Sequence, residues 1–305
     1  MVLVSRLCSA SLVVASLIAC SGPGVDDDEI AQPGPSGSAG GKPDGATPAP
    51  VDAGVSEIQF RIEFDYRFDD AGYFAAAERR ATLEAAAASW GRIFSDDFPA
   101  IPAGTEVRTR HPEAPGESGF GFVIDREIDD LLVFVGCSEM DGVGGTMAIS
   151  NSAAAINAVT DPVLRDELRE RYQGDRFQPW TAWISFDCED DFYFDQSMSS
   201  DDDIPSADAD FYSVALHELG HVLGFGTADA FFALREEAPM RFVGANAVAA
   251  YGEAVPLSSS GVHLDSAVQS DGRFTLMDPS RPGGVRTEPT PLDIAVLTDL
   301  GYTAP

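Results

Sequence analysis

The chain has 305 residues, 44% of them hydrophobic and 23% charged, a composition that suits one soluble globular domain with appendages. It carries 50 Asp and Glu against 19 Lys and Arg, for a net charge of −31 at pH 7. Such a surface repels nucleic acid and anionic lipid head groups, which argues against DNA or RNA as a partner and favours cationic partners or calcium.

Residues 1–20 have the features of a bacterial lipoprotein signal peptide. Arg6 precedes an apolar run that is too short and too rich in serine to span a membrane. The run ends in Leu-Ile-Ala-Cys, which resembles the bacterial lipobox, so we expect Cys20 to carry a lipid and to form the mature N-terminus. A plain secretory signal is the alternative. In both cases the protein is exported, either to a lipid-anchored position in a bacterial cell envelope or into the medium.

Residues 21–55 are rich in Gly, Pro, Ser, Ala and Asp and cannot bury enough apolar surface to offset the entropy of the chain. They are predicted to form a disordered tether between the lipid and a folded domain. The lipid is the only predicted contact with a membrane. That domain spans residues 56–305, with an N-terminal subdomain (56–226) and a C-terminal subdomain (227–305).

Strands and helices are predicted to interleave in the N-terminal subdomain. Alternating apolar and polar residues predict a strand buried on one face, and a continuous apolar run predicts a strand inside a sheet. Alanine and other strong helix formers predict a long helix, and a charged segment that ends at a glycine predicts a short one. In chain order the elements are a strand at 58–68, a helix at 73–94, a strand at 130–137, a helix at 161–174 and a strand at 180–187. This order predicts an α+β fold with a mixed sheet.

The chain has four cysteines, and two of them lie in the predicted signal peptide. Cys8 leaves with the signal peptide, and Cys20 is expected to carry the lipid. Cys137 and Cys188 then remain as a pair in an oxidising compartment, so we expect them to form a disulfide bond. Neither lies near a histidine in the sequence, which argues against a catalytic cysteine.

Apolar residues recur at helical spacing in FYSVALHELGHVLGFG, residues 211–226, which predicts a half-buried helix. His217 and His221 are four positions apart and therefore project from the same face of this helix. Two imidazoles in this arrangement can bind one metal ion, and Glu218 can take a proton from water bound to that ion. Gly224 lets the chain turn out of the helix.

The stretch HELGHVLGFG resembles the metzincin clan of zinc peptidases, whose motif is H-E-x-x-H-x-x-G-x-x-H followed by a methionine turn. Thr227 stands where most metzincins have the third histidine, and threonine is a poor zinc ligand. In the leishmanolysin-like branch a long insertion precedes that histidine. His263, 42 positions after His221, and then Met277 follow in this order, so the resemblance covers about the last third of the chain.

This resemblance implies a metzincin-like catalytic domain, with a twisted mixed sheet and an active-site helix, and the function of an exported zinc endopeptidase. His217, His221 and His263 would bind Zn²⁺, and Glu218 would activate a zinc-bound water that attacks the peptide carbonyl. Met277 would form an apolar floor under the three imidazoles. The implied partner is a protein or peptide substrate, and we expect the enzyme to be a monomer.

A carboxylate is the alternative to His263 as the third metal ligand, since zinc also accepts oxygen donors. Asp229 is close to the motif in sequence, and Glu236 or Glu237 would suit a zinc peptidase with a glutamate ligand. His111, in a loop, is predicted to be an ordinary surface histidine.

Acidic clusters at residues 186–195 and 199–210 precede the motif helix and are candidates for binding calcium through carboxylates. Their spacing differs from that of an EF-hand loop, so a solvated acidic surface is the simpler interpretation. The alternative function is an acidic envelope lipoprotein without catalytic activity, which binds calcium or a partner and holds a structural zinc. Structural zinc normally has four protein ligands, which argues against this alternative.

The C-terminal subdomain is less regular and is predicted to close with a helix. Thr290 can cap this helix, and Pro291 fits its first position. Asp293 completes a capping box with Thr290, and Gly301 ends the helix.

Overall fold

The structure is a computed structural model that describes residues 60–152, 159–172, 176–195, 203–206, 208–280 and 283–304. The predicted signal peptide with Cys20 and the predicted tether lie outside the described residues. Among the residues that are described, no helix combines the length and the apolar character that a membrane crossing requires. Lipidation of Cys20 and the division of the folded domain at residue 226 stay predictions.

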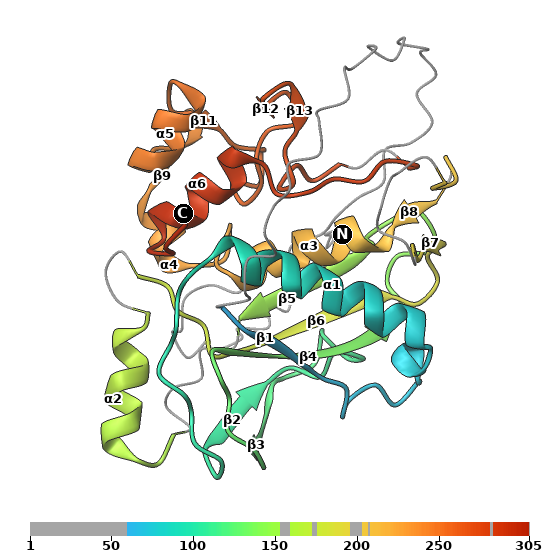
Figure 1. Cartoon of the computed structure of the whole chain (residues 1–305), viewed down its shortest axis with the longest axis vertical. Helices are drawn as coiled ribbons and strands as arrows, with labels where there is room; N and C mark the ends of the chain where they lie inside the picture. The colour runs from blue at the N-terminus through green and yellow to red at the C-terminus, as the bar shows by residue number, and fades with distance from the viewer. Residues whose placement is uncertain are drawn as a thin grey trace, which may run out of the picture.

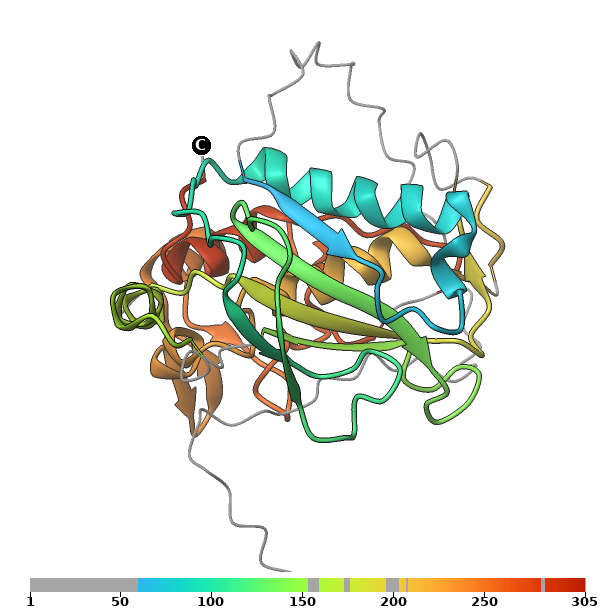
Figure 2. The same cartoon turned by 90° about the horizontal axis from the view of Figure 1, so that it is seen from below.

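A four-stranded mixed sheet forms the centre of the molecule, with the strand order β1-β4-β6-β5. Three strands run parallel, namely β1 (Ile62–Asp65), β4 (Leu131–Ser138) and β6 (Thr181–Asp187). The fourth, β5 (Ala148–Ser152), pairs antiparallel with β6 at one edge. This sheet and the six α-helices of the described segments confirm the predicted α+β class (Figures 1 and 2).

β1 is shorter than the predicted strand at 58–68, because the chain turns soon after Asp65. The backbone N–H of Asp69 donates to the carbonyl of Tyr66 at 3.1 Å. The Asp65 carboxylate accepts from both the backbone N–H and the guanidinium of Arg67. These turn bonds end the ladder that the alternating pattern predicted. β4 and β6 match their predicted strands, whereas β5 has no counterpart among the predicted elements.

Both faces of the sheet are covered. Two helices, α1 (Ala77–Ile93) and α3 (Phe211–Val222), lie side by side over one face (Figures 1 and 2). The other face packs against α2 (Pro162–Glu170) and the ribbon of β2 (Glu106–Thr109) and β3 (Phe120–Val123). Every residue of β6 is therefore buried, on both faces of its alternating pattern.

The C-terminal part is less regular, as predicted. Short elements predominate there and in the connections before α1 and α3. They are η1 (Tyr73–Ala75), β7 (Phe192–Tyr193), β8 (Ala209–Asp210), α4 (Asp229–Ala233), β9 (Arg235–Glu237), β10 (Met240–Phe242), α5 (Ala245–Tyr251), β11 (Val255–Pro256), β12 (Gln269–Ser270) and β13 (Arg273–Phe274). The last helix is α6 (Pro291–Asp299), and its predicted capping box between Thr290 and Asp293 is confirmed.

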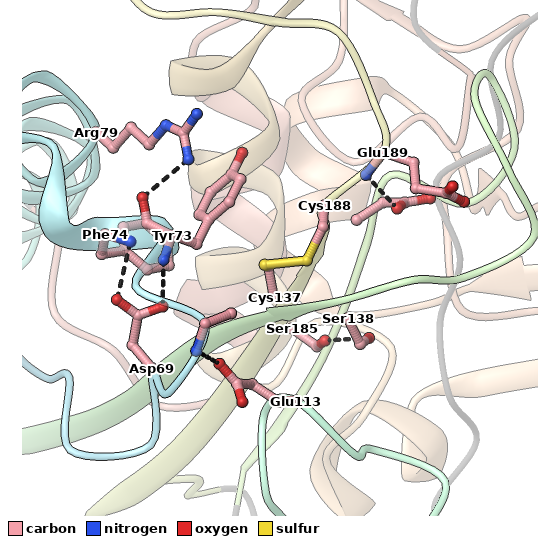
Figure 3. The surroundings of a disulfide bond; sticks show 12 residues. Asp69, Tyr73, Phe74, Arg79, Glu113, Cys137, Ser138, Ser185, Cys188 and Glu189 are labelled. Atoms are coloured by element: carbon pink, nitrogen blue, oxygen red, sulfur yellow. Dashed lines mark hydrogen bonds between the residues drawn. A yellow bond between two sulfur atoms is a disulfide. The ribbon is translucent and has the colours of Figure 1, made fainter.

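A disulfide bond joins Cys137, near the end of β4, to Cys188, directly after β6, which confirms the predicted pair (Figure 3). Tyr73 of η1 lies beside this bond. The two cysteines are 51 positions apart in the chain, but they lie at the ends of the neighbouring parallel strands β4 and β6. The bond therefore holds β4 and β6 together at the ends where both strands pass into loops.

Replacing both cysteines by serine is expected to lower the free energy of unfolding by about 2–4 kcal/mol, because the unfolded chain gains loop entropy. The measurement is urea unfolding of the Cys137→Ser/Cys188→Ser variant beside the unaltered protein. A reducing agent should destabilise the unaltered protein and leave the variant unchanged. Equal free energies of unfolding for the two proteins would contradict a stabilising role for the bond.

Candidate metal centre

The motif helix α3 is buried on every side, whereas its apolar spacing predicted a half-buried helix. Asp210 caps its first turn by accepting from the backbone N–H of Ser213 at 3.2 Å. From α1, the indole N–H of Trp90 donates to the carbonyl of Leu216 at 3.0 Å. The sheet, α1 and the C-terminal segments enclose the helix, so even its polar side chains are held inside the protein.

A buried ion cluster fixes the N-terminal end of α3. The Arg286 guanidinium donates to both oxygens of the Asp210 carboxylate, at 3.0 and 3.1 Å, and lies 2.8 Å from a carboxylate oxygen of Asp195. Burial lowers the pKa of Arg286, but the bonds with the two carboxylates outweigh burial and raise it. The cluster thus ties the segment before α6 to the start of the motif helix. Of the acidic cluster at 199–210, only Asp210 has this capping role, and part of the cluster lies outside the described residues.

The chain beyond α3 brings His263 next to the helix. Gly226 has φ 72°, in the left-handed region that favours glycine. A Cβ atom at Gly226 would lie 2.2 Å from the carbonyl oxygen of Val262, so glycine is needed for this segment to pass so close. The hydroxyl of Thr227 donates to the carbonyl of His221 at 2.6 Å. Thr227 therefore closes the last turn of the helix in place of supplying a metal ligand.

His217, His221 and His263 form one buried cluster, although His263 lies 42 positions after His221. The Nε2 atom of His221 lies 3.0 Å from Nε2 of His217 and 3.0 Å from Nε2 of His263. One ring nitrogen from each histidine lies within 4.8 Å of the others, close enough for a single metal ion to contact all three. The structure brings together the three residues that the sequence predicted as metal ligands.

Backbone carbonyls determine which ring nitrogen of each motif histidine carries the hydrogen. Nδ1 of His217 lies 2.8 Å from the carbonyl oxygen of Leu276, and Nδ1 of His221 lies 2.7 Å from that of Phe225. Because a carbonyl oxygen only accepts hydrogen bonds, we assign the hydrogen to Nδ1 in both rings. In the neutral tautomer each Nε2 then presents a lone pair to the cluster. Lone pairs 3.0 Å apart repel one another, and a bound cation removes this repulsion.

The donor set of the cluster fits zinc. Imidazole nitrogen is a preferred ligand of Zn²⁺ and of neighbouring transition metals, whereas calcium and magnesium prefer oxygen. Within the described part of the chain, the group consists of three histidines with no additional cysteine or carboxylate. Three protein ligands and one position for water is the arrangement of catalytic zinc, while structural zinc normally has four protein ligands.

Glu218 directly follows the first histidine of the cluster, and its side chain is completely buried. It is the one carboxylate of α3. The hydroxyl of Ser150 on β5 donates to its backbone carbonyl at 3.1 Å, which fixes this turn of the helix against the edge strand. A carboxylate beside a metal-bound water can act as a general base, and a dry site strengthens its electrostatic interactions.

Met277 packs against α3 at the turn between the two motif histidines. It is completely buried, and a Cβ atom at Gly220 would lie 2.6 Å from its sulfur. The missing side chain at Gly220 thus provides the space that the methionine occupies. The carbonyl of Met277 accepts from the backbone N–H of Leu264, next to His263, at 2.8 Å. The methionine and the third histidine are therefore positioned by the same pair of segments.

Asp293 of α6 holds the segment that orients His217. One carboxylate oxygen accepts from the backbone N–H of Leu276 at 2.9 Å, and the other from that of Met277 at 3.0 Å. The same carboxylate accepts from the N–H and the hydroxyl of Thr290. Burial raises the pKa of Asp293, although these hydrogen bonds act in the opposite direction. The sequence predicted only the capping role, because the link to Leu276 joins distant segments and has no local signal.

Asp293→Ala is expected to weaken zinc binding by about 10–100-fold, because Leu276 would lose the contact that positions its carbonyl against His217. The measurement is zinc affinity in competition with a chromophoric chelator. Asp299→Ala is the matched control, since Asp299 lies on the same helix but caps α5. It should lower stability and leave the zinc affinity unchanged. Equal zinc affinities for the two variants would contradict the role assigned to Asp293.

The alternative third ligands lie outside the histidine cluster. Asp229 is exposed at the start of α4, and Glu236 and Glu237 are exposed on β9. His111 also lies outside the cluster, in a loop, as predicted. It is half-buried, with its ring centre 5.1 Å from that of Phe68.

No protein-family model matches this chain, and no curated protein matches it either. Three converging histidines occur in metal sites on unrelated folds, so the cluster alone does not define a family. The metzincin resemblance therefore remains a proposal, and the function is inferred from the geometry of the site.

Proposed function

We propose that this protein is an exported zinc-dependent endopeptidase with a metzincin-like catalytic domain of the leishmanolysin-like branch. The observation that carries the proposal is the approach of His263 Nε2 to within 3.0 Å of His221 Nε2, beside His217. Two motif histidines, a third after a long excursion and a following methionine are also the order of that branch. Cys20 would anchor the enzyme to the cell envelope through its lipid.

Each residue of the centre has a distinct part in hydrolysis. His217, His221 and His263 would hold the metal through Nε2. When bound, zinc lowers the pKa of a coordinated water and polarises the carbonyl of the peptide bond. Glu218 accepts a proton from that water and returns it to the nitrogen of the leaving amine. One water is consumed as the C–N bond breaks, and the products are a carboxylate and an amine.

The surroundings of the cluster support a catalytic role over a structural one. The carbonyls of Leu276 and Phe225 orient the motif imidazoles, and Asp293 holds Leu276 in place. Such contacts fix the donor nitrogens before the metal binds, which reduces the cost of ordering them. As far as the chain is described, the cluster has one protein ligand fewer than structural zinc normally has. This favours the peptidase over a non-catalytic lipoprotein.

Zinc-dependent cleavage of peptides tests the proposal. The full-length protein is stripped of metal with a chelator, then supplied with zinc or with calcium, and cleavage of internally quenched peptides is followed by fluorescence. We expect cleavage to be lost on stripping and to return with zinc but not with calcium alone. Full cleavage by the stripped protein, or no cleavage with one zinc bound per chain, would refute the peptidase function.

A further inference from the structure

Two loops meet at the end of the sheet that carries the disulfide bond. The first, residues 139–147, connects β4 to β5, and the second, residues 188–191, follows β6. The bond between the cysteines joins the strand ends from which both loops leave (Figure 3). This end of the sheet is acidic, because it carries Asp141, Asp187, Asp190 and Asp191.

Asp187 and Asp190 are both buried, at 0% and 9% exposure. One oxygen of each carboxylate has a backbone partner. The N–H of Glu189 donates to Oδ1 of Asp187 at 2.8 Å, and that of Gly144 donates to Oδ1 of Asp190 at 2.7 Å. The other oxygen, Oδ2, is buried in both residues and has no hydrogen-bond partner in the described parts of the chain. A buried carboxylate oxygen without a partner costs free energy, which a bound cation would offset.

The neighbouring charges that act on Asp190 are negative. Burial raises the pKa of Asp190, and the neighbouring charges of Asp187, Asp141 and Asp191 raise it further. Burial also raises the pKa of Tyr73; the charge of Arg79 lowers it, and the charges of Asp190 and Asp187 raise it. Within the described residues, no ion pair with Lys or Arg neutralises either of the two buried carboxylates, Asp187 and Asp190.

We propose that Asp187 and Asp190 bind a calcium ion through their Oδ2 atoms, together with backbone carbonyl oxygens of the loop 139–147. Carboxylate and carbonyl oxygens are the ligands of calcium, which tolerates the irregular geometry of a loop. This loop has a fixed shape, because the Asp141 carboxylate accepts from the backbone N–H of Thr146 at 2.6 Å and from its hydroxyl at 3.1 Å. The calcium site does not depend on the peptidase function and stands even if that function fails.

Calcium at this place would stabilise the edge of the sheet that supports the metal centre. The loop 139–147 leads directly into β5, and the backbone N–H of Asp187 donates to the carbonyl of Met147 at 2.8 Å. Three positions further, Ser150 of β5 bonds the turn of α3 that carries Glu218. An ion that joins the loop to the end of β6 would therefore hold β5 in register beside the motif helix.

A second acidic group offers the matched control. Carboxylate oxygens of Asp97, Asp129 and Asp130 lie within 4.8 Å of one another. Two of these three carboxylates already have donor groups. The Asp130 oxygens accept from two backbone N–H groups, at 2.6 and 2.8 Å. Asp129 lies 3.3 Å from the guanidinium of Arg61. Replacing Asp129 removes one surface charge without touching the proposed calcium site.

Terbium luminescence tests the proposal on the full-length, zinc-loaded protein. Tb³⁺ replaces calcium at oxygen sites and emits when a nearby aromatic ring such as that of Tyr73 is excited. We expect saturable emission from one site per chain that calcium displaces. Asp190→Asn, which keeps an acceptor for Gly144, should lower calcium affinity by about tenfold or more through the lost charge, while Asp129→Asn leaves it unchanged.

Thermal unfolding with and without calcium provides the second measurement, since a ligand that binds the folded state raises the melting temperature. Calcium should raise Tm for the unaltered protein and for Asp129→Asn, and much less for Asp190→Asn. Zinc content reports that the histidine cluster, and with it the fold, is intact in each variant. No saturable calcium binding by the unaltered protein, or equal calcium affinity in Asp190→Asn, would overturn the proposal.

Discussion

Glu218→Gln is expected to lower kcat for peptide cleavage by about 10²–10⁴-fold while one zinc per chain stays bound. Glutamine has nearly the size of glutamate and fits the same buried position on α3, but it cannot accept the proton of the attacking water. The three imidazoles are untouched, so metal binding should persist. The measurement pairs kcat on a fluorogenic peptide with zinc content of the same sample.

Glu237→Gln is the matched control, because Glu237 is an exposed carboxylate on β9. It should cleave peptides at the rate of the unaltered protein. If Glu218→Gln kept full activity at full zinc content, the role of Glu218 as general base would be wrong. Loss of zinc in Glu218→Gln would instead show that the carboxylate binds the metal.

His263→Ala is expected to have the largest effect on metal binding. Loss of a contact outside the ligand shell weakens metal affinity by about 10–100-fold. Removal of one of the three protein ligands should weaken zinc affinity by more than this. Peptide cleavage at ordinary zinc concentrations should be lost with it. The measurement is zinc affinity by chelator competition, with a far-ultraviolet circular dichroism spectrum to confirm that the variant is folded.

The exposed carboxylates near the motif provide the comparison for this variant. Asp229→Asn and Glu236→Gln should retain the zinc affinity of the unaltered protein, because both side chains lie outside the histidine cluster. Zinc affinity that survives in His263→Ala but falls in Glu236→Gln would identify a carboxylate as the third ligand. Equal affinity in all three variants would show that two histidines and water suffice.

Local patterns in the sequence were enough to predict the motif helix and its two histidines. Their spacing of four positions places them on one helical face whatever surrounds the helix. The third ligand is different, because its position depends on a contact between distant segments. Gly226 must lack a side chain for Val262 to pass against it, and no local pattern at His263 reports this. His263 was predicted only from the order of residues in a resembling family.

Two further features could not be predicted from local sequence patterns: the complete burial of α3 and the pairing of the edge strand β5 with β6. The apolar spacing in α3 predicts a half-buried helix, whereas its polar residues also lie inside the protein. The sequence does not predict β5, because Ala-Ile-Ser-Asn-Ser is short and mostly polar and its pairing with β6 defines the strand. The capping box of Asp293 follows from adjacent residues, but its bonds to Leu276 and Met277 require the tertiary fold.

A crystal structure of the zinc-loaded protein, with anomalous scattering recorded at the zinc absorption edge, tests the central claim most directly. The predicted result is one zinc ion per chain bound by Nε2 of His217, His221 and His263 at about 2.0–2.1 Å, with water in the remaining position. A zinc ion bound elsewhere, or one enclosed by a fourth protein side chain, would contradict it.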